Sequence, residues 1–343
     1  MSRGVIALLG SGETAPGMTK VHRRLLARHD DVLAVNLDSP YGFQENVEQV
    51  TGKLVDYFDT SLHTQLRALA LPSYESASDV ERALVKHAVR SATYVFAGPG
   101  SPSYALAQWT PLDLVSDLRA VLDNDGTVCF SSAAVLTLGS HTAPIYEIYK
   151  VGAPATWLEG LDLFAELGLS CAAIPHFDNA EGRNYDTRYC YIGERRLVEL
   201  EEQLPTGTAI LGVDEHTALT FDLAADSVSV TGRGHGHWRY RAQTLTLENG
   251  TTTDLRALRE FAHATTAVSP RPRPTEPSRD LDALLASVHT QPSFDPAPLI
   301  DALLTLRGEL KARGDYDLAD ALRRALTDSG VEVRDTPDGV TWT

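Results

Sequence analysis

Short apolar runs alternate with stretches of helical periodicity along the first 265 residues of the chain. The apolar runs predict strands at residues 3–9, 31–36, 69–71, 92–97, 127–130, 168–175 and 209–218. The periodic stretches predict helices at residues 18–29, 46–58, 78–91 and 103–124, and an acidic helix that ends at Leu204. This alternation is typical of an α/β fold with a doubly wound, mostly parallel sheet. Short alternating segments from residue 220 to 247 predict antiparallel strands at the edge of that sheet.

Three of the predicted strands run directly into small or polar residues. Glycine turns at residues 10–14 and 98–102 each follow a strand, and the strand at residues 127–130 runs into residues 131–134. Because the carboxyl ends of parallel strands meet at one edge of a doubly wound sheet, these segments are expected to lie together. Such a convergence favours an enzyme.

The strand at residues 127–130 ends on two hydroxyl side chains, Ser131 and Ser132. One interpretation is a nucleophile elbow, a sharp strand-to-helix turn that presents a serine oxygen beside backbone N–H groups. The other is an ordinary strand end in which Ser131 or Ser132 caps a helix that begins near Ala133. The pattern at this point leaves both interpretations open.

Further polar candidates follow. His176 stands directly after the predicted strand at residues 168–175, where a general base would be placed. Glu147 is a carboxylate flanked by aromatic residues. Arg188, Arg195 and Arg196 could hold a substrate carboxylate through bidentate hydrogen bonds, or could pair with the acidic helix beside them.

Composition narrows the class of protein. The 343 residues are 43% hydrophobic and carry a formal net charge of −16, which argues against nonspecific binding to nucleic acid or anionic membranes. Three scattered cysteines and the lack of a signal peptide or a long apolar run predict a cytoplasmic protein. His235 and His237 alternate with glycine, but no third ligand is evident, so neither a metal nor another cofactor is expected.

The composition changes after residue 265. Prolines between residues 265 and 298 predict an extended linker with one helix at residues 279–289. Helices at residues 299–313 and 317–329 and a strand and turn at residues 331–342 follow. The predicted organisation is a domain at residues 1–265, a proline-rich linker at residues 266–296 and a small helical module at residues 297–343.

Five segments of the first 265 residues match a known pattern in order and spacing. They are Gly-Ser-Gly-Glu at residues 10–13, Phe-Ala-Gly-Pro-Gly-Ser at 96–101, Phe-Ser-Ser-Ala-Ala at 130–134, Ile-Pro-His-Phe at 174–177 and Gly-Val-Asp-Glu-His-Thr-Ala at 212–218. On these segments the chain resembles the serine hydrolases related to dipeptidase E and cyanophycinase, whose fold is like that of class I glutamine amidotransferases. The late Gly-x-Asp-Glu-x-Thr-Ala match is the most specific.

The resemblance implies a serine peptidase or amide hydrolase acting on acidic dipeptides or aspartyl-arginine units. Ser132 would be the nucleophile, His176 the general base and Glu147 the acid that orients it, with Asp178 and Glu215 in reserve. The oxyanion hole would comprise Gly98, Gly100 and Ala133, and the substrate would be bound by Asn179, Arg188 and Glu215. A small peptide or isopeptide is thus the expected partner, and a homodimer is left open.

Two positions depart from the family pattern. Phe130 and Ala134 stand where the family has glycines on either side of the serine. A phenylalanine two residues before the nucleophile must fit against the following helix, so Ser131 stays an alternative nucleophile. A catalytically inactive ligand-binding protein with the same fold is the alternative function.

The last residues resemble a different protein family. Residues 312–324 and 330–342 are similar to the C-terminal end of cysteinyl-tRNA synthetases, a region that in those enzymes belongs to the anticodon-binding part. From residue 297 onward there are six Lys or Arg and nine Asp or Glu, a net charge of −3, which is poor for contacts with phosphates. The expectation is a docking or stabilising module, with tRNA binding as the alternative.

Overall fold

The computed structural model describes residues 4–71, 73–182 and 184–267 of the chain. Beyond them it describes residues 300, 304, 305, 307, 308, 311, 320, 323, 326, 327, 331, 333–336 and 339–342. The chain divides into two compact units, Met1–Ser269 and Pro270–Thr343. Most of the predicted linker, including the helix expected at residues 279–289, lies outside the described residues. Among the described residues, no helix combines the length and apolarity needed to cross a bilayer.

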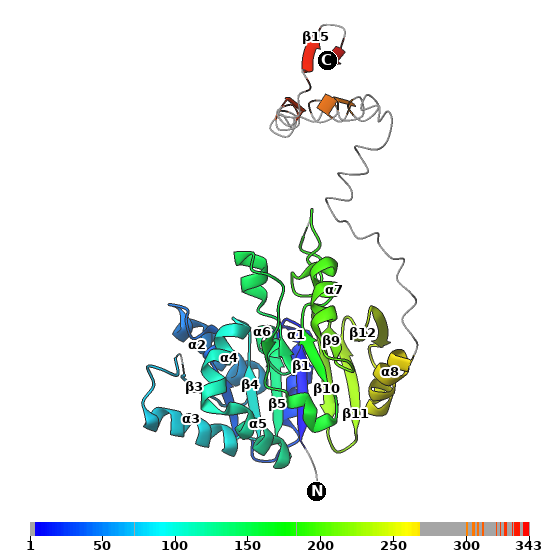
Figure 1. Ribbon diagram of the computed structural model, residues 1–343. Coiled ribbons are helices and arrows are strands. Elements are labelled where there is room, and N and C mark those ends of the chain that lie inside the picture. Colours follow the sequence, from blue (N-terminus) through cyan, green and yellow to red (C-terminus); the bar gives the residue numbers. More distant parts are fainter. Residues whose placement is uncertain are drawn as a thin grey trace. The chain divides into compact units, whose positions relative to one another are not determined.

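An eight-stranded sheet forms the centre of the first unit (Figure 1). Five parallel strands lie in the order β3 (Leu66–Leu69), β2 (Ala34–Leu37), β4 (Tyr94–Ala97), β5 (Thr127–Ser131) and β1 (Val5–Leu9). Antiparallel strands β10 (Thr217–Asp222), β11 (Ser227–Gly232) and β14 (Thr252–Asp254) extend the sheet beyond β1. The parallel strands confirm the α/β fold class predicted from the alternation of strands and helices.

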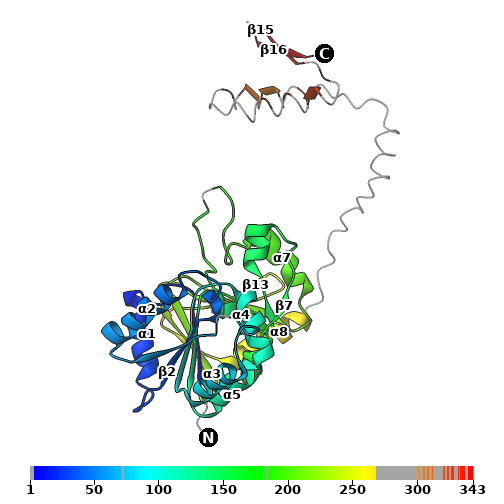
Figure 2. The same ribbon diagram turned by 90° about the vertical axis from the view of Figure 1, so that its left-hand side faces the viewer.

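Helices cover both faces of this sheet (Figure 2). On one face, α1 (Pro16–Leu26) and α2 (Val47–Tyr57) pack with Val5, Ala7 and Leu9 of β1. On the other face, α3 (Asp79–Ser91), α4 (Pro102–Leu112) and α5 (Leu114–Asp123) pack with Ile6 and Leu8. Because successive strand residues point to opposite faces, a fully apolar strand such as β1 supplies both cores.

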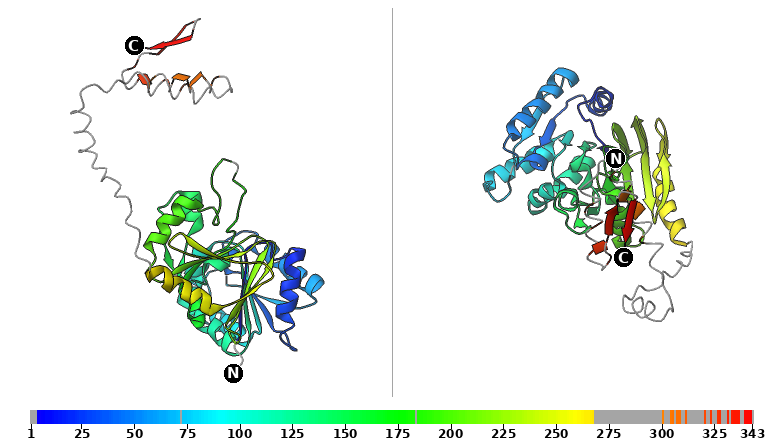
Figure 3. Two further views of the ribbon diagram at one scale, coloured as in Figure 1. Left: turned by 90° about the vertical axis from the view of Figure 1, so that its right-hand side faces the viewer. Right: turned by 90° about the horizontal axis from the view of Figure 1, so that it is seen from above.

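A second, six-stranded sheet carries the rest of the unit. Its strands lie in the order β13 (Gln243–Leu247), β12 (Gly236–Tyr240), β9 (Ala209–Val213), β8 (Cys171–Ile174), β6 (His141–Thr142) and β7 (Leu158–Glu159). Strands β8 and β9 run parallel, with Ile174 opposite Gly212. Helices α7 (Gly193–Gln203) and α8 (Leu255–Ala267) pack against this sheet (Figure 3).

Short helical segments complete the first unit. They are α6 (Ala133–Leu136), the π-helical turns η2 (Phe58–Leu62) and η3 (Glu147–Val151), and the 3-10 turns η1 (Ser39–Tyr41) and η4 (Leu163–Leu167). The turn η3 and the loop ahead of α7 both project beyond the sheet edge at which β5 ends (Figure 1).

Four predicted elements differ from the structure. The strand predicted at residues 69–71 is β3, which lies earlier, at Leu66–Leu69. The helix predicted at residues 103–124 is two helices, because Asp113 takes a left-handed conformation (φ 54°) just after Pro111. The strand predicted at residues 209–218 turns at Asp214 and continues as β10 in the other sheet. The antiparallel strands predicted at residues 220–247 are divided between the two sheets, because the chain returns to the six-stranded sheet between β11 and β12.

The second unit contains a β-hairpin, with β15 (Val333–Thr336) antiparallel to β16 (Gly339–Trp342). This hairpin agrees with the strand and turn predicted at residues 331–342. The described residues between 300 and 327 are helical. Ile300, Leu304, Leu326 and Val333 form a small apolar cluster.

Candidate active site

Ser132 lies at a sharp turn between β5 and α6. All five residues of β5 are buried between β1 and β4, so the end of the strand is held on both sides. The Ser132 N–H donates to the Leu9 carbonyl of β1 at 3.0 Å. The backbone of Ser132 has φ 52° and ψ −124°, a conformation that costs free energy for any residue except glycine. A strained turn of this kind is the backbone feature of a nucleophile elbow.

The two neighbouring serines point to different partners. Ser132 Oγ lies 2.9 Å from His176 Nε2 and makes no capping hydrogen bond to α6. Ser131 is fully buried, and its Oγ donates to Glu13 Oε2 at 3.1 Å. The capping interpretation is therefore wrong for Ser132, and the geometry of a nucleophile and base belongs to Ser132 rather than Ser131.

Both residues that replace the expected glycines are accommodated in the core. Phe130 is fully buried, and its ring centroid lies 5.7 Å from that of Trp109 on α4. Ala134 is also fully buried in the same apolar cluster. Phe130 and Ser131 are successive strand residues and point to opposite faces of β5, so the bulk of Phe130 is taken up in the core against Trp109.

His176 follows β8 in a left-handed conformation with φ 47°. Its Nδ1 lies 2.7 Å from Glu215 Oε1, on the opposite side of the ring from Ser132. A carboxylate can only accept, so this contact assigns the proton to Nδ1 and leaves the Nε2 lone pair for the Ser132 hydroxyl. The side chain of His176 is 20% exposed, which leaves it accessible to a ligand.

The predicted pairing of Glu147 with His176 is wrong. Glu147 Oε1 instead accepts a hydrogen bond from Ser103 Oγ at 2.5 Å. Glu215 takes the expected place because Ile174 and Gly212 are opposite each other in the parallel pair β8 and β9. Residues a few positions beyond this pair therefore emerge side by side. The late Gly-x-Asp-Glu motif was the sequence signal for this arrangement.

Glu215 is itself held by the segment that carries His176. Asp178 Oδ1 accepts from the Glu215 N–H at 2.7 Å, and Asn179 Nδ2 donates to Glu215 Oε1 at 3.2 Å. Burial raises the pKa of Asp178, and the hydrogen bond from the Glu215 backbone opposes that rise. Asn179 is 1% exposed. Both Asn179 and Glu215, which were predicted to bind substrate, are thus occupied with orienting His176.

Two of the predicted arginines, Arg188 and Arg195, make internal ion pairs, whereas Arg196 donates from Nη1 to the Ile192 carbonyl at 3.4 Å. Arg188 forms a bidentate pair with Asp186, at 2.9 Å from Nε to Oδ1 and 2.8 Å from Nη2 to Oδ2. These hydrogen bonds are the main reason that the pKa of Asp186 is lowered. Arg195 pairs with Glu199 one turn along α7. Pairing with the acidic helix, the alternative given above, holds for Arg195, whereas the main partner of Arg188 is Asp186, which precedes that helix.

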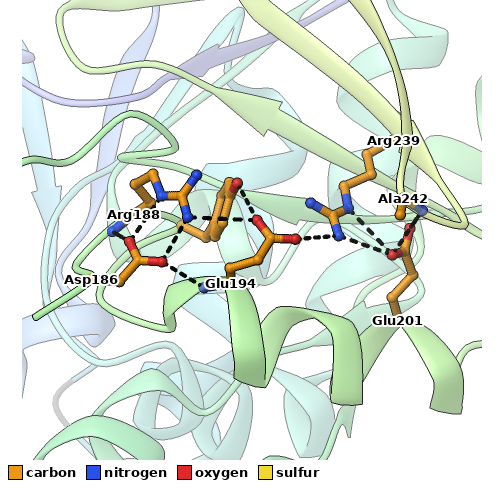
Figure 4. Close-up of polar contacts among 7 residues, drawn as sticks. Asp186, Arg188, Glu194, Glu201, Arg239 and Ala242 are labelled. Carbon is orange, nitrogen blue, oxygen red and sulfur yellow. Dashed lines mark hydrogen bonds and ion pairs between the residues drawn. The ribbon is translucent and has the colours of Figure 1, made fainter.

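The Asp186–Arg188 pair belongs to a larger polar network that also includes Glu194, Glu201 and Arg239 (Figure 4). Arg239 of β12, 6% exposed at its side chain, binds Glu194 at 2.8 Å and Glu201 at 3.2 Å. Tyr189 donates to the other oxygen of Glu194, and the Tyr189 ring packs edge-on against Phe177. The network thereby ties α7 and the loop before it to β12 and to the residue next to His176.

A cavity of about 430 Å³ opens onto Ser132 and His176. Four tyrosines, Tyr146, Tyr149, Tyr185 and Tyr191, line it together with Ala133, Ile145, Lys150, Glu181 and Cys190. We call these four tyrosines the tyrosine wall. Tyr146 and Tyr149 are among the aromatic residues that flank Glu147 in sequence, but the pattern alone did not indicate that they share a cavity with Tyr185 and Tyr191.

The predicted oxyanion residues lie in two places. Ala133 lines the cavity at Ser132, and its N–H is in the first turn of α6, where a backbone donor has no partner within the helix. Gly98 lines a neighbouring cavity of about 400 Å³ together with Glu13 and Pro99. Gly100 has φ 149°, and a Cβ there would lie 2.0 Å from the Pro40 carbonyl oxygen, so this position requires glycine.

The paired histidines have carboxylate partners. His237 Nε2 lies 2.8 Å from Asp214 Oδ1, and His235 Nδ1 lies 3.2 Å from Glu248 Oε2. Within the described part of the chain, no group of three or more His, Cys, Asp or Glu residues is arranged to hold a metal ion.

Comparison with solved structures identifies the fold of the first unit. A peptidase from an acI-B1 Actinobacterium aligns with a TM-score of 0.57 at 20% identity, over 74% of this chain and 97% of that one. The first unit therefore shares the fold of that protein, which is like that of class I glutamine amidotransferases. A putative peptidase E protein from Listeria monocytogenes aligns at 13% identity with a TM-score of 0.46. No protein-family model matches the chain.

Curated relatives match a short C-terminal segment. The cysteine–tRNA ligase of Desulfovibrio desulfuricans is 51% identical over 45 residues, and that of Cutibacterium acnes is 46% identical over 44 residues. These matches cover 13% of this chain and only 9% of each ligase. The similarity to the ligases predicted for the C-terminal end is confirmed for that segment alone.

Proposed function

We propose that the first unit is a serine hydrolase that cleaves the amide bond of a small peptide or isopeptide. One observation carries the proposal, the continuous chain of hydrogen bonds from Ser132 Oγ to His176 Nε2 (2.9 Å) and from His176 Nδ1 to Glu215 Oε1 (2.7 Å). This order of nucleophile, base and orienting acid is the arrangement that activates a serine. The strained backbone of Ser132 supports the same proposal.

The chemistry follows from these contacts. Ser132 Oγ attacks the substrate carbonyl while its proton passes to His176 Nε2, and Glu215 stabilises the resulting imidazolium. The Ala133 N–H receives the negative charge on the carbonyl oxygen. His176 then returns the proton to the leaving amine, which departs and leaves an acyl ester on Ser132. A water molecule, deprotonated by His176, cleaves that ester and restores the free serine.

The cavity supports a small substrate with polar groups. Its volume of about 430 Å³ is in the range of small-molecule sites, and its lining combines the tyrosine wall with one cation, Lys150, and one anion, Glu181. Acidic dipeptides and aspartyl-arginine units, the substrates implied by the family resemblance, carry charges that these two groups can pair with. We propose substrates of this kind.

A fluorophosphonate probe tests the proposal directly. The probe should label the wild-type protein at Ser132, and S132A should abolish labelling while the Tm changes little. S131A is the matched control, because Ser131 has the same side chain one residue earlier but contacts Glu13 instead of His176. S131A should therefore keep its labelling.

Two results would contradict the proposal. Labelling that survives S132A but is lost in S131A would move the nucleophile by one residue. A folded wild-type protein that resists labelling at every pH between 5 and 9 would favour the alternative, a ligand-binding protein with no catalytic activity.

For the C-terminal segment we propose a docking or stabilising role, with tRNA binding as the alternative favoured by the similarity to cysteine–tRNA ligases. Deletion from Ala297 onward should lower the Tm or abolish self-association if the first role holds. Loss of salt-sensitive tRNA binding in the deletion variant would instead support the second.

A cytoplasmic location is also part of the proposal. It rests on three free and buried cysteines, Cys129, Cys171 and Cys190, which suit a reducing compartment. Fractionation of the cells that make the protein tests it, and recovery outside the cytoplasm would overturn it.

A further inference from the structure

Glu147 ends a directional chain of hydrogen bonds at the start of α4. The Tyr104 N–H donates to Ser101 Oγ at 3.2 Å, and Ser101 Oγ lies 3.0 Å from Ser103 Oγ. Because Ser103 Oγ donates its proton to Glu147 Oε1 at 2.5 Å, the Ser101 hydroxyl must donate to Ser103. Every donor in the chain thus has an acceptor, and the carboxylate of Glu147 is its terminus.

The chain joins the glycine turn to a segment that lines the cavity at Ser132. The glycine turn, at residues 98–101, is anchored from the other side by the hydrogen bond from the Ser101 N–H to the Pro40 carbonyl at 2.6 Å. The second segment is residues 145–150, from which Ile145, Tyr146, Tyr149 and Lys150 line the cavity. Glu147 lies within this second segment but does not itself line the cavity.

The second segment in turn supports the far side of the cavity. Tyr149 stacks on Tyr191 with ring centroids 4.9 Å apart, and its hydroxyl lies 2.8 Å from that of Tyr185. Tyr191 donates to Glu181, which also lines the cavity. A continuous series of contacts therefore runs from the glycine turn to Glu147, and the segment that carries Glu147 continues it through Tyr149 to Tyr185 and Tyr191.

We propose that Glu147 is a positioning residue for substrate binding, which holds the tyrosine wall at a fixed distance from Ser132 by anchoring residues 145–150 to Ser103. The inference rests on the proposed function, because the wall matters only if Ser132 reacts with a ligand in the cavity. The role differs from that of a triad acid, since the carboxylate acts through the wall and makes no contact with His176.

E147Q is a conservative variant that can keep the hydrogen bond from Ser103. In E147Q the amide oxygen can still accept from Ser103, and the amide nitrogen takes the place of Glu147 Oε2, which is buried without a hydrogen-bond partner among the described residues. E147A removes the acceptor altogether. S103A removes the donor of the same bond and should reproduce the effect of E147A.

The experiment measures saturation kinetics of labelling by a dipeptidyl fluorophosphonate, which separates the binding constant KI from the rate constant kinact. Loss of one hydrogen bond to a charged group should raise KI about tenfold in E147A and in S103A, with kinact within about twofold of the wild type. In E147Q, KI should stay within about threefold of the wild-type value. Because both single variants break the same bond, the double variant should be no worse than either.

Hydrogen exchange of residues 145–153 and 181–191 gives a second readout that needs no activity. Exchange should accelerate in E147A and S103A and stay slow in E147Q. Equal behaviour of E147Q and E147A, or a loss confined to kinact, would overturn the inference. Failure of the proposed function looks different, since the wild type would then resist labelling while the exchange pattern could still be measured.

Discussion

Glu215 and Glu147 are two half-buried glutamates beside the same cavity, and they have different partners. Glu215 lies far from Ser132 in sequence, yet it binds His176 Nδ1 at 2.7 Å and is held by Asp178 and Asn179. Glu147 lies only fifteen positions after Ser132, yet it binds Ser103 on α4. Distance along the chain is therefore a poor guide to which acid orients the base. The parallel pair β8 and β9 decides the pairing.

Neutralising each glutamate in turn tests which of the two orients His176. E215Q should lower the acylation rate by about 10⁴-fold, because an amide nitrogen would donate to His176 Nδ1 and stabilise the wrong tautomer. E147Q is the matched control and should stay within about threefold of the wild type. Fluorophosphonate labelling rates measure both, and a reversed order would return Glu147 to the role of orienting acid.

A buried histidine away from the triad, His22, should make the free energy of unfolding depend on pH. His22 is fully buried between Tyr94 OH at 2.6 Å and the Glu13 carbonyl at 2.9 Å, and burial lowers its pKa to about 4. The unfolded chain, with a usual histidine pKa near 6.5, therefore binds the extra proton between pH 6.5 and 4. The free energy of unfolding should fall as the pH is lowered through this window, by about 3 kcal/mol in all.

Chemical denaturation at pH 7 and pH 4.5 measures the effect, and H22Q keeps a donor for the Glu13 carbonyl without the titration. H22Q should lose less stability than the wild type on acidification. An identical loss in both proteins would contradict the assignment to His22.

The hydrogen bond from Asn179 to Glu215 should have a smaller effect. N179A removes one donor from the orienting carboxylate, so the acylation rate should fall about tenfold with little change in KI. Asn46 is exposed and makes no capping hydrogen bond, so N46A is a control expected to behave as the wild type. A rise in KI alone for N179A would instead support the predicted substrate-binding role of Asn179.

The smallest effect concerns the tyrosine wall. Y149F removes the exposed hydrogen bond to Tyr185 but keeps the ring that stacks on Tyr191, so KI should change by less than about twofold. Y149A removes the ring and should raise KI more. If KI rose equally in the two variants, the hydroxyl that both lack, and not the aromatic contact, would be what maintains the wall.

Much of the fold could be predicted from local patterns. The apolar runs at β1, β4 and β5 and the helix α3 were found at nearly their observed bounds, because each carries a complete signal in its own residues. In α3 this signal includes Ser78 and Glu81 at the start of the helix, which form a capping box in the structure. The break at Asp113 and the change of sheet at Asp214 were missed, because apolar residues resume soon after each turn, at Leu114 and at Ala218, and the runs on either side look like one element.

Patterns in the sequence predicted the α/β fold and indicated that Ser132 and His176 lie at the ends of strands. Only the tertiary structure decided that Ser132 rather than Ser131 faces His176, and that Glu215 rather than Glu147 orients it. The reason is physical. Whether a residue ends a strand depends on its neighbours in the chain, whereas which side chains meet depends on the backbone torsion of one turn and on the register of strands that are distant in sequence.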